Sequence, residues 1–194
     1  MMAECQIARE DRTAALDILQ QAMFWYPDSE APHLLRARLH QAAGETAEAI
    51  LCYEKAVQIN PKHSLALNNL ASLLSSQEAG GRQDMARALA LATTAWSLHP
   101  EIPEIAETLG WIHVQRGEHL PGLVLLSQAA RRLPRDPMIR FHLAHALAGQ
   151  NRFSDAEQQL NLASELSPDL ARKADYQALR NTLLTRKDVE TAGL

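Results

Sequence analysis

The sequence predicts an all-α protein made of repeated helix–turn–helix units. Two observations lead to this prediction: prolines recur at intervals close to 34 residues, and small residues keep fixed distances from these prolines. The prolines are Pro27, Pro61, Pro100, Pro134 and Pro168, which are separated by 34, 39, 34 and 34 residues. The interval of 39 residues is one period plus five residues, so it predicts an insertion in the second complete unit.

The small residues repeat in three columns. Alanine stands five residues before each proline, at Ala22, Ala56, Ala95, Ala129 and Ala163. Twelve residues before the prolines stand Ala15, Ala49, Ala88, Gly122 and Ala156. Ten residues after the first four prolines stand Ala37, Ala71, Gly110 and Ala144. Because a larger Cβ substituent would hold two helix backbones apart, these columns predict the points where paired helices cross closely.

Each unit contains two blocks with apolar residues at three- and four-residue intervals, which is the period of an amphipathic helix. Breaks such as AAGE, QRGE and GQNR separate the blocks and predict turns. A helix of about 12 to 14 residues, a turn and a second helix fill a 34-residue unit. The proline ends the second helix or opens the next one, because it lacks an N–H group and clashes with the preceding turn.

The pattern resembles the tetratricopeptide repeat family over about residues 11–168. The features that carry the resemblance are the closing prolines, the alanines of the second helices and the pairs Leu70-Ala71, Leu109-Gly110 and Leu143-Ala144. The first unit departs from it with Arg36-Ala37. The resemblance implies a right-handed α–α superhelix, a solenoid. The segments LNNLASLL and ETLGWIHVQRGE are also similar to repeats of bacterial exopolysaccharide-export and protein-sorting systems.

The register divides a single domain, residues 1–194, into successive segments. They are a partial repeat (1–27), a repeat (28–61), a repeat with the insertion (62–100), two repeats (101–134 and 135–168), a capping helix or half repeat (169–187) and a frayed tail (188–194). The partial first repeat suggests a segment excised from a longer array, because terminal repeats usually carry a full cap. Gly80-Gly81 in the insertion predicts either a functional loop or simply a longer turn.

Composition excludes several classes of function. A formal net charge of −4 and the lack of a basic stripe argue against a nucleic-acid partner, including RNA.

Cys5 and Cys52 are isolated and predict neither a disulfide framework nor a zinc site. No apolar run approaches ~20 residues, so we expect no membrane insertion. Without a leader sequence the expected compartment is the cytoplasm, or the periplasm if the parent protein is exported.

We expect no enzymatic activity and no cofactor, because no catalytic motif such as HExxH, a P-loop or GxSxG is present. His142 and His145 could share one helical face as zinc ligands do, but no third ligand is evident, so no metal site is predicted. His40 and His113 occupy equivalent places in their repeats, where the family usually has tyrosine. That equivalence favours a structural use for both.

The resemblance implies that the first helices line a concave groove that holds a peptide or a helix of a partner. Mapped onto this chain, the partner-binding residues are Arg38, Asn68, Asn69, Glu107, Thr108, Trp111, Gln115, Phe141, His142 and His145. Trp111 either anchors the partner or packs between repeats. Asn68 and Asn69 either bond a peptide backbone or lie on a solvated surface. Glu104 and Glu107 would repel a C-terminal carboxylate, which argues against a clamp for chaperone tails.

The sequence therefore predicts a non-catalytic scaffold that binds a protein or peptide. The alternative is a rigid spacer or self-assembly segment of a longer bacterial secretion or exopolysaccharide-export protein, which would form homo-oligomers.

Overall fold

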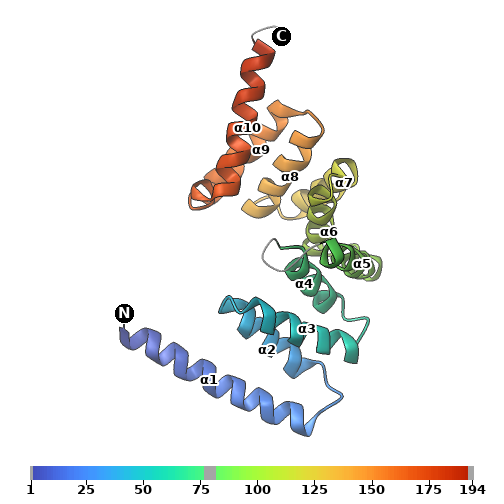
Figure 1. Ribbon diagram of the computed structural model, residues 1–194, viewed down its shortest axis with the longest axis vertical. Coiled ribbons are helices and arrows are strands. Elements are labelled where there is room, and N and C mark those ends of the chain that lie inside the picture. Colours follow the sequence, from blue (N-terminus) through green and yellow to red (C-terminus); the bar gives the residue numbers. More distant parts are fainter. Residues whose placement is uncertain (1, 77–81, 192–194) are drawn as a thin grey trace. The chain divides into compact units, whose positions relative to one another are not determined.

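The computed structural model describes residues 2–76 and 82–191, which form helices joined by short turns (Figure 1). The helices are α1 (Met2–Trp25), α2 (Ala31–Ala42), α3 (Thr46–Ile59), α4 (Ser64–Ser75), α5 (Arg82–Leu98), α6 (Pro103–Gln115), α7 (His119–Arg132), α8 (Pro137–Gly149), α9 (Phe153–Leu166), a 3₁₀ turn η1 (Leu170–Arg172) and α10 (Ala174–Thr191). The predicted all-α class is confirmed, since the two described ranges contain no strand. The predicted loop at Gly80-Gly81 lies outside the described residues.

The helices belong to two compact units, Met1–Leu98 and His99–Leu194. In the first unit α2 pairs with α3, α4 pairs with α5, and α1 packs against α2. In the second unit α6 pairs with α7, α8 pairs with α9, and α10 packs against α9. None of the described helices combines the length and the apolar character that crossing a bilayer requires.

The columns of small residues lie at the helix crossings, as predicted. In the four complete pairs the alanines of these columns are fully buried: Ala37, Ala49, Ala56, Ala71, Ala88, Ala95, Ala129, Ala144, Ala156 and Ala163. The two glycines of the columns, Gly110 and Gly122, are buried as well. Only the equivalents in α1, Ala15 and Ala22, remain half-exposed. In every complete pair, the first helix packs over the small residues of the second helix. Ala15 and Ala22 are more exposed because, within the described residues, no first helix of the same repeat covers α1.

The helices α6 and α7 cross at two glycines. A Cβ atom added at Gly122 would lie 2.6 Å from Cγ2 of Val114 and 2.8 Å from the carbonyl oxygen of Gly110. One added at Gly110 would lie 2.9 Å from Cγ of Leu126. Two facing glycines therefore allow these backbones to approach more closely than alanine would permit.

The turns inside repeats 28–61 and 101–134 have the same backbone conformation. Gly44 and Gly117 adopt positive φ angles of 74° and 78°, a conformation that glycine reaches without strain. The next residue then donates its N–H back to the first helix: Glu118 bonds the carbonyl oxygen of His113 at 2.9 Å. The turn AAGE or QRGE is thus a helix C-cap that reverses the chain.

Histidine side chains reinforce these turns. Nδ1 of His40 lies 2.6 Å from Oε2 of Glu45, and Nδ1 of His113 lies 2.6 Å from Oε2 of Glu118. In the first case Nε2 of His40 accepts a hydrogen bond from Arg36, so Nδ1 is the nitrogen that donates to Glu45. His40 and His113 therefore hold the first helix to the start of the second.

The two ends of the chain differ from the simple repeat. The register predicts a partial helix at about residues 3–9 followed by a second at 11–25, but α1 runs without a break from Met2 to Trp25. This segment contains no glycine or proline, so nothing in it stops a helix. At the other end Tyr176, Leu179 and Leu183 of α10 are buried on one face, and the Tyr176 hydroxyl donates to the carbonyl oxygen of Leu160 at 3.1 Å.

Substitution of Gly122 by alanine should destabilise the second unit. The added methyl group overlaps Val114 and the Gly110 carbonyl, and overpacking of this kind costs about 1–3 kcal/mol. Better helix propensity returns about 1 kcal/mol, so we expect a net loss of up to about 2 kcal/mol in the free energy of unfolding. Urea denaturation followed by circular dichroism measures it. The exposed substitution Leu120→Ala in the same helix is the control, and a stability gain in Gly122→Ala would contradict the close crossing.

Candidate partner-binding surfaces

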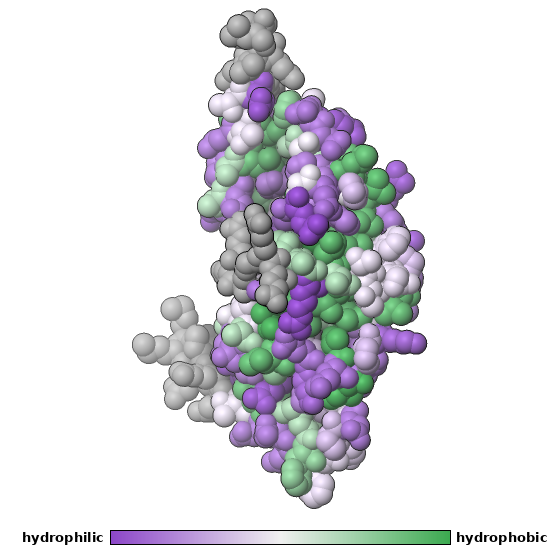
Figure 2. Space-filling view, turned by 45° about the vertical axis from the view of Figure 1, so that its right-hand side comes forward, coloured by the Kyte–Doolittle hydropathy of each residue, from purple (hydrophilic) through white to green (hydrophobic). Residues whose placement is uncertain are grey.

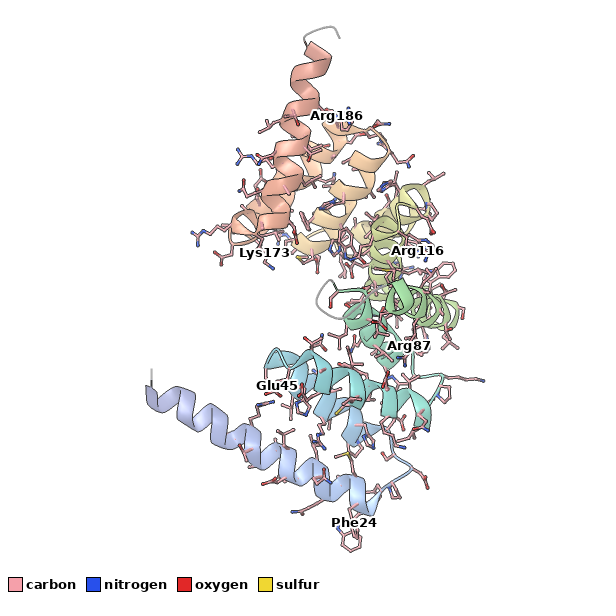
Figure 3. All side chains as sticks on the ribbon, in the orientation of Figure 1. Phe24, Glu45, Arg87, Arg116, Lys173 and Arg186 are labelled. Carbon is pink, nitrogen blue, oxygen red and sulfur yellow. The ribbon has the colours of Figure 1, made fainter. Side chains whose placement is uncertain are left out.

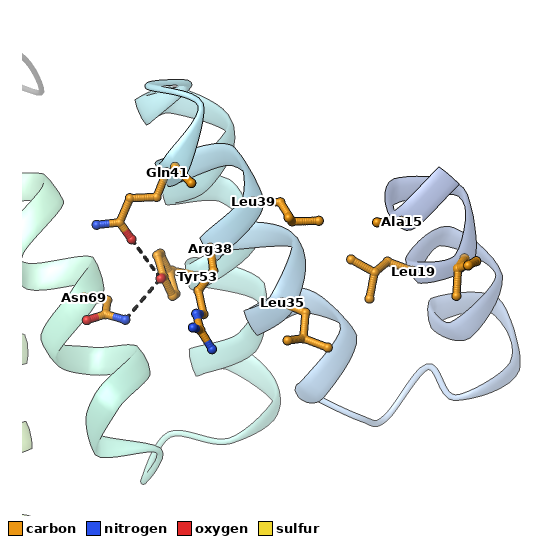
Figure 4. A pocket seen from close by; sticks show the side chains of 10 residues that line it. Ala15, Leu19, Leu35, Arg38, Leu39, Gln41, Tyr53 and Asn69 are labelled. Atoms are coloured by element: carbon orange, nitrogen blue, oxygen red, sulfur yellow. Dashed lines mark hydrogen bonds between the residues drawn. The ribbon is translucent and has the colours of Figure 1, made fainter. Parts of the chain in front are cut away.

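The first unit contains an open groove of about 780 Å³ between α1 and α2, which we call the α1–α2 groove (Figure 4). Its apolar lining consists of Ala15, Ile18, Leu19, Leu35, Leu39 and Ala42. Its polar lining consists of Arg38, Gln41, Tyr53 and Asn69, and extends the groove onto α3 and α4. The groove therefore joins an apolar trough to a polar end.

Several of the apolar residues are open to solvent. Ile18 is 65% exposed and Leu35 is 50% exposed, whereas Leu19 beneath them is nearly buried. In Figure 4 the side chains of Leu35 and Leu39 point from α2 toward α1, and Leu19 points back toward them. Exposed apolar residues that face each other across a groove are typical of a binding surface rather than of a solvated one.

A hydrogen-bonded chain lies at the polar end of the groove. The hydroxyl of Tyr53 donates to Oε1 of Gln41 at 3.0 Å and accepts from Nδ2 of Asn69 at 3.1 Å (Figure 4). Burial raises the pKa of Tyr53, although the bond from Asn69 opposes the effect. The phenol is therefore neutral at physiological pH and fixes the orientation of both amides.

Arg38 is the charged residue of the groove lining. It is exposed and forms no ion pair or hydrogen bond within the described part of the chain. The neighbouring arginines are already engaged: Arg12 pairs with Glu45, and Arg36 donates to Oε1 of Gln20 at 3.0 Å. The contact of Arg36 ties α2 to α1, and the contact of Arg12 ties α1 to Glu45 at the turn that follows α2 (Figure 3). Of these three arginines, Arg38 is therefore the one that remains available to an anionic group, as far as the described residues show.

The second unit holds a cluster of aromatic rings and histidines, Glu107, Trp111, Phe141, His142 and His145, which we call the Trp111 cluster. Trp111 of α6 stacks on His142 of α8 with ring centroids 3.9 Å apart and an angle of 12°. It meets His145 edge-on at 5.3 Å. Oε1 of Glu107 lies 2.5 Å from Nδ1 of His142 and fixes the stacked ring. Trp111 is half-buried, so its ring packs between α6 and α8 and still reaches solvent.

His145 is enclosed more deeply than its place on the predicted groove suggests. Phe141 meets it edge-on at 4.8 Å, and Nε2 of His145 is buried without a hydrogen-bond partner in the described residues. Burial, with help from His142 and His119, lowers the pKa of His145 to about 4, although Asp175 opposes the shift. His145 is therefore neutral at pH 7.

The structure separates the ten predicted partner-binding residues into two groups. Arg38 is exposed, and Asn69, Glu107, Trp111, Gln115 and His145 are half-buried. Asn68, Thr108, Phe141 and His142 are buried, with exposed fractions of 5–8%, so they support the surface from beneath rather than form it. A residue can thus lie on the predicted groove-facing side of its helix and still be buried, because the neighbouring first helix covers part of that side.

Residues of α1 and α3 line the α1–α2 groove although the sequence analysis did not assign them to a site. Ile18 and Leu19 belong to the segment taken as a partial repeat, and Tyr53 belongs to a second helix. The signal in the sequence was the set Ala15, Leu19 and Ala22, which stand twelve, eight and five residues before Pro27 and are preceded in the register by only part of a first helix. His142 and His145, the pair weighed as zinc ligands, join no cluster of three or more metal-ligating groups within the residues that the structure describes.

Apolar side chains also reach the surface outside the groove (Figure 2). Phe24, Trp25 and Tyr26 at the end of α1 are about two-thirds or more exposed, and Phe24 points away from the helices (Figure 3). Phe24 meets Trp25 edge-on, with ring centroids 5.2 Å apart. We call these three residues the aromatic tip.

Three family models that describe a tetratricopeptide repeat match the chain, at residues 31–63, 52–88 and 124–171. Together the matches extend over residues 31–88 and 124–171, more than half of the sequence. The curated proteins contain no match to the chain.

Solved structures share the fold at low sequence identity. A crystal structure of MamA protein has a TM-score of 0.66 at 16% identity and covers 88% of this chain and 91% of that one. YrrB, whose structure is described as a TPR protein with an unusual peptide-binding site, has a TM-score of 0.65 at 19% identity, with coverage of 88% and 84%. PilF of Pseudomonas aeruginosa has a TM-score of 0.65 at 20% identity, with coverage of 97% and 88%. These similarities establish the fold.

The low pKa of His145 predicts an acid-dependent loss of stability in the second unit. Between pH 6.5 and pH 4 the unfolded chain binds a proton at this position and the folded chain does not, so the free energy of unfolding falls as the pH falls. The free energy of unfolding falls by about 3 kcal/mol at most, since each unit of pKa difference corresponds to about 1.4 kcal/mol. His145→Gln should remove this part of the pH dependence in urea denaturation at pH 7 and pH 4.5. The exposed His99→Gln is the control, and an unchanged slope in His145→Gln would contradict the buried, neutral imidazole.

Proposed function

Because the chain is built of tetratricopeptide repeats, we propose that it is a non-catalytic scaffold that binds a peptide or helix of a partner protein. The observation that carries the proposal is the α1–α2 groove, which combines exposed Ile18 and Leu35 with the unpaired Arg38. Binding pockets commonly consist of apolar walls and a few polar groups that fix orientation.

The parts of the groove would contribute differently to binding. Burial of Ile18 and Leu35 by a partner supplies affinity, at about 25 cal/mol per Å² of apolar surface removed from water. Oδ1 of Asn69 and Nε2 of Gln41 form no other hydrogen bond in the described residues, so they can accept from and donate to a peptide backbone. Since Tyr53 holds both amides in place, little side-chain entropy is lost when a partner binds.

The Trp111 cluster is the proposed contact surface of the second unit. Trp111 offers a partly exposed aromatic ring that is already fixed by stacking on His142, so it can add contact area without first being ordered. Glu107 and Gln115 flank it with polar groups. The neutral imidazole of His145 adds no positive charge to this surface at pH 7.

The proposal is tested with peptides selected from a random library against the intact chain, followed by titration calorimetry on variants. We expect Leu35→Asp and Asn69→Ala to weaken binding of groove-directed peptides at least about tenfold, because each removes a central contact. Trp111→Ala should do the same for peptides directed to the second unit.

Lys55→Ala is the matched control, since Lys55 is exposed on α3 and lies outside the groove. Circular dichroism checks that each variant remains folded. If folded Leu35→Asp, Asn69→Ala and Trp111→Ala all bind the selected peptides as the unsubstituted chain does, neither surface is the binding site.

The aromatic tip favours a second candidate function, a self-assembling segment of the kind that the exopolysaccharide-export resemblance implies. Three adjacent exposed aromatic residues are costly in water and are enriched at interfaces. Light scattering over a concentration series should then show that the mean mass of the particles increases with concentration. The variant Trp25→Ser should abolish this increase. A scattering mass that stays at one chain across the series would rule out self-assembly through the tip.

A further inference from the structure

The complete helix pairs show what packs over the inner face of each second helix. In each pair the residues twelve, eight and five before the proline are buried beneath the first helix of the same repeat, for example Ala49, Tyr53 and Ala56 beneath α2. The equivalent residues of α1 are Ala15, Leu19 and Ala22, and two of them line the α1–α2 groove. The groove therefore lies where a first helix would cross α1.

The second unit shows which residues of the following repeat such a helix also contacts. Trp111 of α6 touches His142 and His145, which stand eight and eleven residues after Pro134. The residues eight and eleven after Pro27 are Leu35 and Arg38, and both line the groove. Thus α1 and α2 present the two faces that α7 and α8 use to hold α6.

We infer that the α1–α2 groove binds an amphipathic α-helix of a partner polypeptide, which completes the first repeat in the way that α6 completes the third. This inference rests on the proposed function and specifies the partner. In the complete repeats the first helices span 12 or 13 residues, so the partner helix has about three turns. It carries a small residue where it crosses Leu19 and apolar residues at i, i+3 and i+4 against Ile18 and Leu35.

The charge of the groove specifies one further residue of the partner. Arg38 occupies the place of His145, so the partner residue that faces it is the equivalent of Trp111. Arg12 is neutralised by Glu45, and Arg36 is bonded to Gln20 and His40. Of these three arginines of α1 and α2, Arg38 is therefore the one with no side-chain partner among the described residues, and it lines the groove. A carboxylate at the position of Trp111 would pair with Arg38.

The probe is a peptide with the sequence of α6, residues 103–115, carrying Trp111→Glu, an acetylated N-terminus, an amidated C-terminus and a fluorescein label. Its matched control carries Trp111→Lys. Fluorescence anisotropy should show that the chain binds the Glu peptide about five- to tenfold more tightly than the Lys peptide. The variant Arg38→Glu should reverse this order, because the charges are then exchanged.

Two further measurements identify the bound form. Circular dichroism should gain helical signal when the Glu peptide binds, since a free helix of this length is marginal in water. The same peptide with Ala106→Pro should lose binding at least about tenfold, because proline interrupts the helix. Equal affinity of the proline peptide, or no charge preference in either protein, would overturn the inference.

The remaining outcomes separate the inference from the proposed function. If library-selected peptides bind the groove but the α6 probes do not, the groove binds extended peptides and only the inference fails. If neither class binds, both fail. If sedimentation shows a dimer of the chain that Leu35→Asp dissociates, the groove is filled by a second copy, and the inference of a different partner is overturned.

Discussion

The close crossing of paired helices is the constraint on which the rest of this structure depends. Each complete repeat has one small residue in the first helix and two in the second at these columns, and the alanines among them are fully buried in all four complete pairs. Where α6 and α7 cross, even the alanine methyl group has no room at Gly110 or Gly122. Close approach brings the longer apolar side chains on either side into contact, and dispersion and burial then stabilise the pair.

The same constraint explains the α1–α2 groove. The column Ala15–Leu19–Ala22 gives α1 a surface shaped for a crossing helix, and α2 gives the adjoining surface through Leu35 and Arg38. In the described residues these surfaces meet across an open groove instead of a helix. The proposed binding surface therefore needs no special motif, because it consists of the same residue types that pack against a helix in the complete repeats.

The Trp111 cluster shows how packing and polarity compete within one site. Stacking of Trp111 on His142 and the bond from His142 to Glu107 compensate for the burial of one imidazole. His145 receives no such compensation at Nε2, and burial therefore lowers its pKa to about 4. Of the two histidines three residues apart on α8, His142 thus forms a hydrogen bond with a carboxylate, whereas His145 forms no such bond within the described residues.

The sequence by itself determined the fold class, the helix pairs and the crossing residues, because these depend on local periodicity and on side-chain size, which can be read along the chain. Its assignment of Arg38, Asn69 and Trp111 to one partner-binding groove stays a prediction. Only the tertiary structure decided that α1 is one continuous helix and that Asn68, Thr108, Phe141 and His142 are buried. It alone brought Ile18 and Leu19 to the groove. Burial depends on which helix lies against which, and that information is spread over residues more than a repeat apart.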